Sequence, residues 1–278
     1  MAQMLFNPQE FTASKAKPLP VILMLDTSDT MNWVINPEAV THTGQFVMSE
    51  GHRVELVEGG IARITVLNEA VKKMVRTFAK YERDATEILV AVITFGKETR
   101  LILPPSAASD VRFVDLEAGG EKTPLAEALD IAKQLIEDKT QIPSRAFRPL
   151  VVLVSDGMAD DGWQGRLDDF VKNGRTTKCD RMALAISKDA DRDMLAKFIA
   201  GTDHTVFESD SAEEITEFFK FVAMSTVQRT LSQNPNITPK DSAVKVPPPP
   251  TPVNKSQNPV EDQPEKEKPQ EDDEEGYW

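Results

Sequence analysis

The sequence predicts an α/β protein with a doubly wound, mostly parallel sheet and helices on both of its faces. Two observations lead to this fold class. Apolar runs of strand length alternate along the chain with longer segments whose apolar residues recur at helical spacing. Three polar clusters, around residues 26, 123 and 156, stand at strand ends or a helix start, where ligands bind in open α/β sheets.

The first half of the pattern begins with Val21-Ile22-Leu23-Met24-Leu25, a continuous apolar run that is typical of a buried strand. Residues 61–80 follow as a helix, because their apolar residues lie three or four positions apart. Residues 87–95 form a second buried strand. Gly96 then turns the chain into residues 99–103, which we expect to be an antiparallel edge strand.

The second half of the chain repeats this alternation. We expect helices at 125–136, 167–173, 191–200 and 212–231, and strands at 150–154, 182–186 and 205–208. Strands that are separated by helices are joined by crossovers and therefore run parallel. The order of elements is that of a doubly wound sheet.

Residues 32–60 interrupt the pattern just after the first polar cluster. Residues 45–48 and 53–57 flank a turn that contains Gly51, and their alternation predicts a β-hairpin. A structureless loop of this length is uncommon in a compact domain, so we expect a small ordered insertion. Two interpretations stay open: a hairpin that folds over the site and selects a partner, or a surface hairpin without such a role.

The polar clusters contain the residue types that bind a hard metal ion. Asp26-Thr27-Ser28-Asp29-Thr30 follows the first strand, and Asp156-Gly157 follows the strand at 150–154. The expected metal ligands are Asp26, Ser28, Thr30, Thr123 and Asp156. Two carboxylates and three hydroxyls form an all-oxygen set, which suits Mg²⁺ or Mn²⁺ with several retained waters.

Three further carboxylates lie close to these positions in the sequence. We expect Asp29 to face solvent, with a weakening of the ion's attraction for an acidic partner as the alternative. Asp160 and Asp161 are expected to be turn and helix-cap residues, with contacts around the metal ligands as the alternative.

The arrangement resembles the von Willebrand factor A family and its metal-ion-dependent adhesion site. In that family Asp-x-Ser-x-Ser, a later Thr and an Asp-Gly after a central strand surround one divalent ion. The resemblance covers residues 17–230, and Thr30 stands where the family has a second Ser. Leu19-Pro20-Val21 and Asp160-Asp161-Gly162-Trp163-Gln164 look like the intracellular bacterial TerY-type, tellurium-resistance branch. Asp29, where that branch usually has Gly, and the insertion after Met31 depart from it.

The resemblance implies a protein-binding role in which a partner supplies a Glu or Asp to the ion. The TerY-type branch further implies a stress-response or defence module, with a Ser/Thr kinase and a PP2C-type Ser/Thr phosphatase as partners. Two alternatives stay open. One is an adaptor for an AAA-type ATPase, and the other is a Mg²⁺-dependent phosphohydrolase built on the same residues.

Common catalytic motifs are missing from the sequence. It has no G-x-x-x-x-G-K-[ST] phosphate loop and no G-x-S-x-G nucleophile elbow. A haloacid-dehalogenase-type phosphatase would need an aspartate where Ser28 stands. The three histidines are not at metal-ligand spacing, and nothing near Cys179 marks a nucleophilic pair. We therefore expect a binding protein rather than an enzyme; a hydrolase would have only Asp29 as its general base.

Composition indicates an acidic protein of a reducing compartment. The net charge of −13 disfavours non-specific binding to nucleic acid. Cys179 is the only cysteine, so no disulfide can form within the chain. Residues 1–20 lack the apolar core of a signal peptide, and no run of about 18 apolar residues could span a membrane. We expect a cytoplasmic protein.

The character of the sequence changes after residue 231. Ten of the 19 prolines lie from Pro235 onward, and ten acidic residues but only four lysines follow from Asp241 onward. Such a segment cannot bury enough apolar surface to offset chain entropy, which predicts disorder. The expected organisation is a lead-in at 1–16, a von Willebrand A domain at 17–231 with its insertion at 32–60, and a Pro-rich acidic tail at 232–278.

Overall fold

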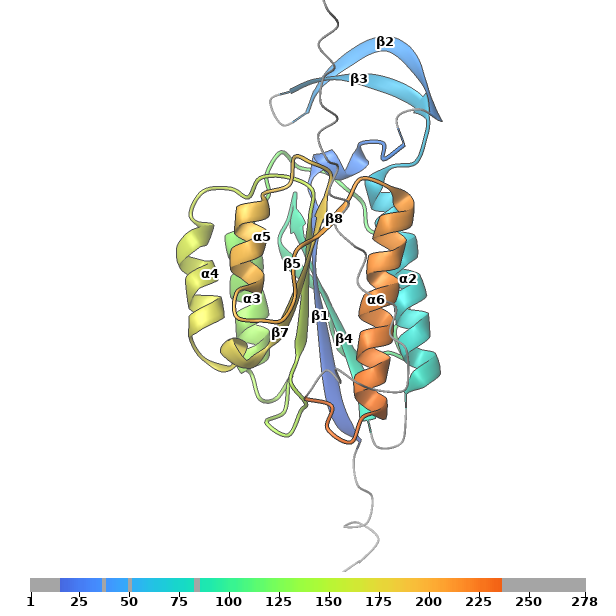
Figure 1. Cartoon of the computed structure of the whole chain (residues 1–278). Coiled ribbons are helices and arrows are strands. Elements are labelled where there is room, and N and C mark those ends of the chain that lie inside the picture. The colour runs from blue at the N-terminus through green and yellow to red at the C-terminus, as the bar shows by residue number, and fades with distance from the viewer. Residues whose placement is uncertain (1–15, 37–38, 50–51, 83–85, 237–278) are drawn as a thin grey trace, which may run out of the picture.

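A computed structural model describes residues 16–36, 39–49, 52–82 and 86–236 of the chain. A six-stranded sheet forms its centre, with helices on both faces (Figure 1). The strands, in spatial order, are β5 (Arg100–Ala107), β4 (Thr86–Gly96), β1 (Lys17–Thr27), β6 (Leu150–Ser155), β7 (Asp180–Ile186) and β8 (Phe207–Ser209). All neighbours pair in parallel except β4 and β5, which are antiparallel. The predicted fold class and the predicted edge strand are confirmed.

Five α-helices in the described part of the chain cover the sheet. One face carries α2 (Arg63–Tyr81) and α6 (Ala212–Leu231), and the other carries α3 (Leu125–Glu137), α4 (Trp163–Lys172) and α5 (Arg192–Ile199) (Figure 1). In the described part of the chain, no helix is long and apolar enough to cross a membrane.

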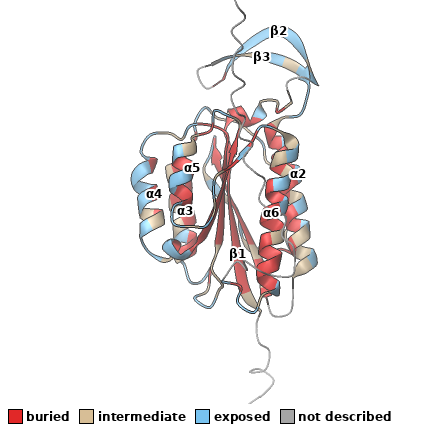
Figure 2. Cartoon of the chain, viewed as in Figure 1, coloured by how far each residue is buried: buried red, intermediate tan, exposed pale blue. Residues whose placement is uncertain are grey.

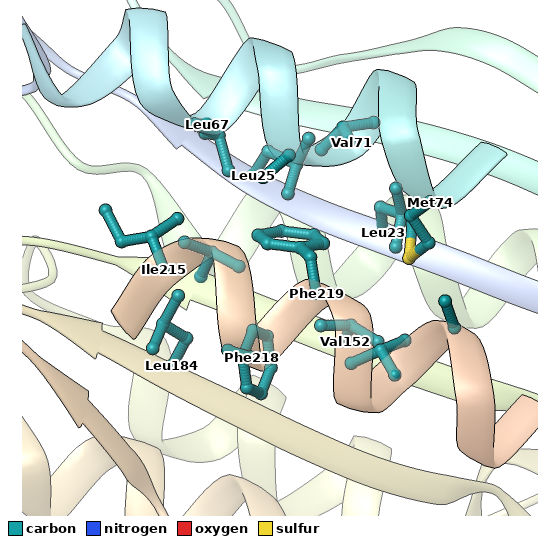
Figure 3. Close-up of a cluster of buried hydrophobic side chains, with 14 of the residues drawn as sticks. Leu23, Leu25, Leu67, Val71, Met74, Val152, Leu184, Ile215, Phe218 and Phe219 are labelled. Atoms are coloured by element: carbon teal, nitrogen blue, oxygen red, sulfur yellow. The ribbon is translucent and has the colours of Figure 1, made fainter. Parts of the chain in front are cut away.

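The strands are buried on both faces because alternate side chains enter two separate cores (Figure 2). Leu23 and Leu25 of β1 point toward α2 and α6, whereas Ile22 and Met24 point toward α3. Figure 3 shows the first of these cores, in which Phe219 of α6 lies among side chains of α2 and the sheet. This packing explains why the strands read as continuous apolar runs.

The chain leaves β1 to one side for β4 and returns to its other side for β6. This arrangement creates a topological switch point between the carboxyl ends of β1 and β6, where open α/β sheets bind ligands. The register places Leu25 beside Val154, so Asp26 and Ser155 come next to each other at the ends of the two strands.

The predicted hairpin in the insertion is present and longer than expected. It consists of β2 (Val40–Ser49) and β3 (His52–Gly59), which pair in antiparallel fashion. The hairpin stands beyond the carboxyl end of the sheet, above the short 3₁₀ helix η1 (Asp29–Asn32) (Figure 1). Phe46 and Met48 are exposed on it by 49% and 67%, so the hairpin is not part of either core.

The first strand begins earlier than its apolar run indicates. It starts at Lys17 and includes Pro18 and Pro20, although proline cannot donate a hydrogen bond to a neighbouring strand. β6 pairs with β1 only from Val21 onward, so both prolines precede the three-strand part of the pairing. Residues 1–15 of the predicted lead-in at 1–16 and residues 237–278 of the predicted tail at 232–278 lie outside the described residues.

The core around Phe219 yields a stability prediction. Phe219 is 1% exposed, so Phe219→Ala should lower the free energy of unfolding by about 3–5 kcal/mol through lost burial and a new cavity. Leu231→Ala in the same helix is the control, because Leu231 is 46% exposed and should change it by less than about 1 kcal/mol. Urea unfolding followed by circular dichroism measures both, and equal effects would contradict the packing described here.

Candidate metal centre

The three predicted segments meet at the carboxyl edge of the sheet. The backbone N–H of Gly119 donates to the carbonyl of Thr27 (2.8 Å) and that of Asp29 donates to the carbonyl of Gly120 (2.9 Å), which joins the loop before α3 to the loop after β1. A β-carbon built on Gly157 would lie 3.9 Å from Oγ1 of Thr123 and 4.0 Å from Oγ1 of Thr30. The structure thus brings all five sequence-predicted ligands together, and each of them is buried.

A chain of hydrogen bonds connects the two carboxylates. Oδ1 of Asp26 accepts from the backbone N–H of Ser28 (2.9 Å). The hydroxyls of Ser28 and Thr30 lie 3.1 Å apart, and Thr30 donates to Oδ1 of Asp156 (2.8 Å). Ser155, which the sequence did not single out, donates its hydroxyl to Oδ2 of Asp26 (2.7 Å). Both carboxylates are therefore held in fixed orientations by short side chains of neighbouring residues.

Arg63 supplies the positive charge at this cluster. Its Nη1 donates to Oδ2 of Asp156 at 2.7 Å, and the side chains of the two residues are 9% and 0% exposed. The guanidinium also lies over the ring of Trp33, 5.4 Å from the ring centre. The role of Arg63 could not be predicted from spacing, because the insertion separates it from the Asp-x-Ser-x-Thr segment. A signal existed, since an arginine in the first turn of a helix opposes the helix dipole.

Burial of two carboxylates side by side changes their proton affinity. Removal from water raises the pKa of Asp26 to about 7, and the negative charge of Asp156 adds to this rise, while hydrogen bonds from Ser28 and Ser155 oppose it. Burial also raises the pKa of Asp156, against the opposing effect of the Arg63 charge. The site is thus short of positive charge even with Arg63 in place.

The donor set fits a hard divalent ion. Two buried carboxylates and three hydroxyls converge, and a second positive charge would relieve the repulsion that raises both carboxylate pKa values. Nitrogen and sulfur ligands do not surround it: among the described residues, no group of three or more His, Cys, Asp or Glu side chains could hold a metal. The residues present therefore form an oxygen-rich set of the kind that holds a hard divalent ion.

Two of the neighbouring carboxylates position the loops of the site. We expected Asp29 to face solvent, but it is only partly exposed and accepts hydrogen bonds from Ser49 Oγ (2.5 Å) and Asn32 Nδ2 (3.2 Å). That expectation was wrong, because β2 ends directly above η1. Asp160 accepts from the backbone N–H of Thr123 (3.2 Å) and donates its own N–H to the Thr123 carbonyl (3.0 Å). It fixes the loop that carries Thr123.

Comparison with known proteins agrees with this fold. The model of the von Willebrand factor type A domain matches residues 61–221, which is more than half of the chain. The chain belongs to the von Willebrand factor type A domain family. The match begins after the insertion, so β1 and the Asp26–Thr30 segment lie outside it. An uncharacterised Mycobacterium tuberculosis protein, Rv2850c, is 44% identical over 77 residues, which are 26% of this chain and 12% of that protein.

Solved structures of low sequence identity share the fold. Proximal thread matrix protein 1 from the mussel byssus has a TM-score of 0.52 and 13% identity over 77% of this chain. A second structure of that protein, with a zinc-occupied MIDAS motif, has a TM-score of 0.51 and 14% identity over the same share. The chain spans 49% of the length of these mussel structures.

The raised pKa of Asp26 predicts how the metal-free protein responds to pH. From about pH 4 to about pH 7 the folded protein retains a proton on Asp26 that the unfolded chain releases. Stability should therefore fall as pH rises through this window, by about 5–10 °C in Tm, and Asp26→Asn should remove most of that fall. Thermal unfolding in EDTA at about pH 5 and about pH 8 measures this. A wild-type protein that is equally stable at both values would contradict the account.

Proposed function

We propose that the chain is a metal-dependent protein-binding module and that Asp26, Ser28, Thr30, Thr123 and Asp156 hold Mg²⁺ or Mn²⁺. The observation that carries this proposal is the hydroxyl chain that joins two buried carboxylates at the switch point of the sheet. Membership of the von Willebrand factor type A family supports it, as does the zinc-occupied MIDAS motif of the mussel protein that is similar in fold.

Each residue has a role that follows from its contacts. Asp26 and Asp156 contribute the negative charge that attracts the ion, and Ser155 and the Ser28 backbone orient Asp26. The hydroxyls of Ser28, Thr30 and Thr123 add oxygen donors without neutralising charge. A bound ion supplies a positive centre that can accept a carboxylate oxygen from a partner protein. We propose that this partner presents a Glu or Asp.

The hairpin is the best candidate for a second contact with the partner. It rises from the metal loop, and Ser49 at the end of β2 is hydrogen-bonded to Asp29 beside the site. Phe46, Met48 and Leu56 are exposed on it, which gives the hairpin apolar surface that a partner can contact. We propose that the hairpin selects among acidic partners, the first of the two interpretations that the sequence allowed.

The proposed role is binding and not catalysis. Asp29 was the only general base that a phosphohydrolase could use here, and it is engaged by Ser49 and Asn32. Cys179 is buried, and burial raises the pKa of its thiol to about 12, which makes it a poor nucleophile.

The proposed cellular role and partners rest on the resemblance of the sequence to the TerY-type branch. On that basis we propose a cytoplasmic protein of a bacterial stress-response or defence module, with a Ser/Thr kinase and a PP2C-type phosphatase as partners. We further propose that residues 17–231 are the binding domain, that 32–60 are its insertion, and that 232–278 follow it as a tail.

Calorimetric titration of the full chain with Mg²⁺ and Mn²⁺ tests the site. The wild type should bind one ion, and the double variant Asp26→Ala/Asp156→Ala should bind it more than about 100-fold more weakly, because both charged ligands are lost. Asp168→Ala/Glu217→Ala is the matched control, since both residues are exposed carboxylates that pair with a lysine of their own helix. Equal binding by wild type and the Asp26/Asp156 variant would contradict the assignment.

A further inference from the structure

Arg63 stands at a position that local helix chemistry does not favour. It is the first residue of α2, where the positive end of the helix dipole disfavours cations, and the next three residues, Ile64-Thr65-Val66, carry no charge. Its side chain is nevertheless 9% exposed. A buried arginine at a helix start is expected only where a carboxylate requires it.

The contacts of Arg63 lie with the metal site and with the base of the insertion. Nη1 donates to Asp156, the guanidinium lies over Trp33, and the backbone N–H donates to the Trp33 carbonyl (3.0 Å). Nε is buried and makes no hydrogen bond to any residue that the structure describes. The ion pair with Asp156 thus holds a side chain whose Nε has no hydrogen-bond partner among the described residues. The guanidinium can therefore leave Asp156 without breaking a hydrogen bond at Nε.

Asp156 has both of its oxygens engaged. Thr30 donates to Oδ1, and Arg63 donates to Oδ2. A divalent ion that uses Asp156 therefore meets a fixed positive charge on the same carboxylate, and like charges at contact distance in a buried site repel strongly. We propose that Arg63 is a built-in counter-cation, which neutralises Asp156 in the metal-free protein and competes with the metal for it. This inference rests on the proposed function and adds a way in which metal binding at the same site is regulated.

The surroundings provide a second position for the guanidinium. A cavity of about 280 Å³ adjoins Arg63, and Asp189 and Asp210 also line it, together with Lys188. Asp189 and Asp210 also interact with Arg192, so the cavity offers the guanidinium polar surroundings with balanced charge. When an ion takes Asp156, Arg63 can turn into this cavity, which other polar side chains line.

Displacement of Arg63 from Asp156 would also change the contacts at the base of the insertion. Trp33 and Arg63 lie at the two ends of the inserted segment, where Val34 and Ala62 form an isolated β-bridge and Ile35 N–H donates to the Ile61 carbonyl (2.9 Å). The cation–π contact between Arg63 and Trp33 crosses this junction. Metal binding is therefore coupled to the base of the hairpin, and Trp33 reports on it.

Substitution of Arg63 tests the competition. Arg63→Gln removes the charge and should tighten Mg²⁺ and Mn²⁺ binding by at least about tenfold in calorimetry. The metal-free variant should melt at a lower temperature than the wild type and gain more stability on addition of metal. Arg76→Gln is the control, because Arg76 is exposed on the same helix about 20 Å away, and it should leave the affinity unchanged.

Arg63→Lys is the control for a folding defect, because it retains the positive charge beside Asp156. It should fold and bind metal with an affinity close to that of the wild type. A folded Arg63→Gln that binds the ion no more tightly than the wild type overturns the inference but leaves the proposed function intact. Absence of binding by both proteins overturns the proposed function as well. Binding by Arg63→Gln alone supports the inference.

Fluorescence of the wild type gives a readout that needs no change at Arg63. Addition of Mg²⁺ should shift the Trp33 emission as the guanidinium leaves the ring, and Trp33→Phe should abolish this change. An emission spectrum that stays the same at saturating metal would overturn the coupling.

Discussion

Two carboxylates buried side by side at the ends of adjacent strands form the constraint on which the rest of this structure depends. Asp26 and Asp156 have almost no exposure, and neither can keep its charge there without compensation. Their neighbours provide that compensation in part: Ser28, Ser155 and Thr30 donate hydrogen bonds, and Arg63 donates one together with a positive charge. The elevated pKa values show that a deficit of positive charge remains. A site with this deficit is suited to a divalent ion.

The sheet makes the constraint possible. A parallel sheet with the order β5-β4-β1-β6-β7-β8 places its topological switch between β1 and β6, so the loops after these strands separate and leave room at the edge. The cores on the two faces hold both strands rigidly, and the loop before α3 is tied to the loop after β1 by backbone hydrogen bonds. The insertion adds a hairpin to this edge through Ser49 and Asp29. The hairpin thus stands at the carboxyl end of the sheet, where the candidate metal site lies (Figure 1).

Much of this arrangement could be predicted from the sequence. Apolar runs such as Val21–Leu25 indicate buried strands, and polar residues at their ends indicate a candidate site, because parallel strands end at one edge. The rest depended on tertiary contacts. Asp29 was expected in solvent and instead accepts a hydrogen bond from Ser49, which lies 20 positions away within the insertion. Arg63 is 93 positions from Asp156, and only its unfavourable place in a helix start marked it. Pairs of this kind cannot be derived from spacing.

The most direct test of the central claim is diffraction from crystals of the full chain grown with Mn²⁺, with anomalous scattering used to locate the ion. Our account predicts one strong peak among Asp26, Ser28, Thr30, Thr123 and Asp156, with the guanidinium of Arg63 withdrawn from Asp156. A peak elsewhere, or no peak while Arg63 remains paired with Asp156, would contradict it.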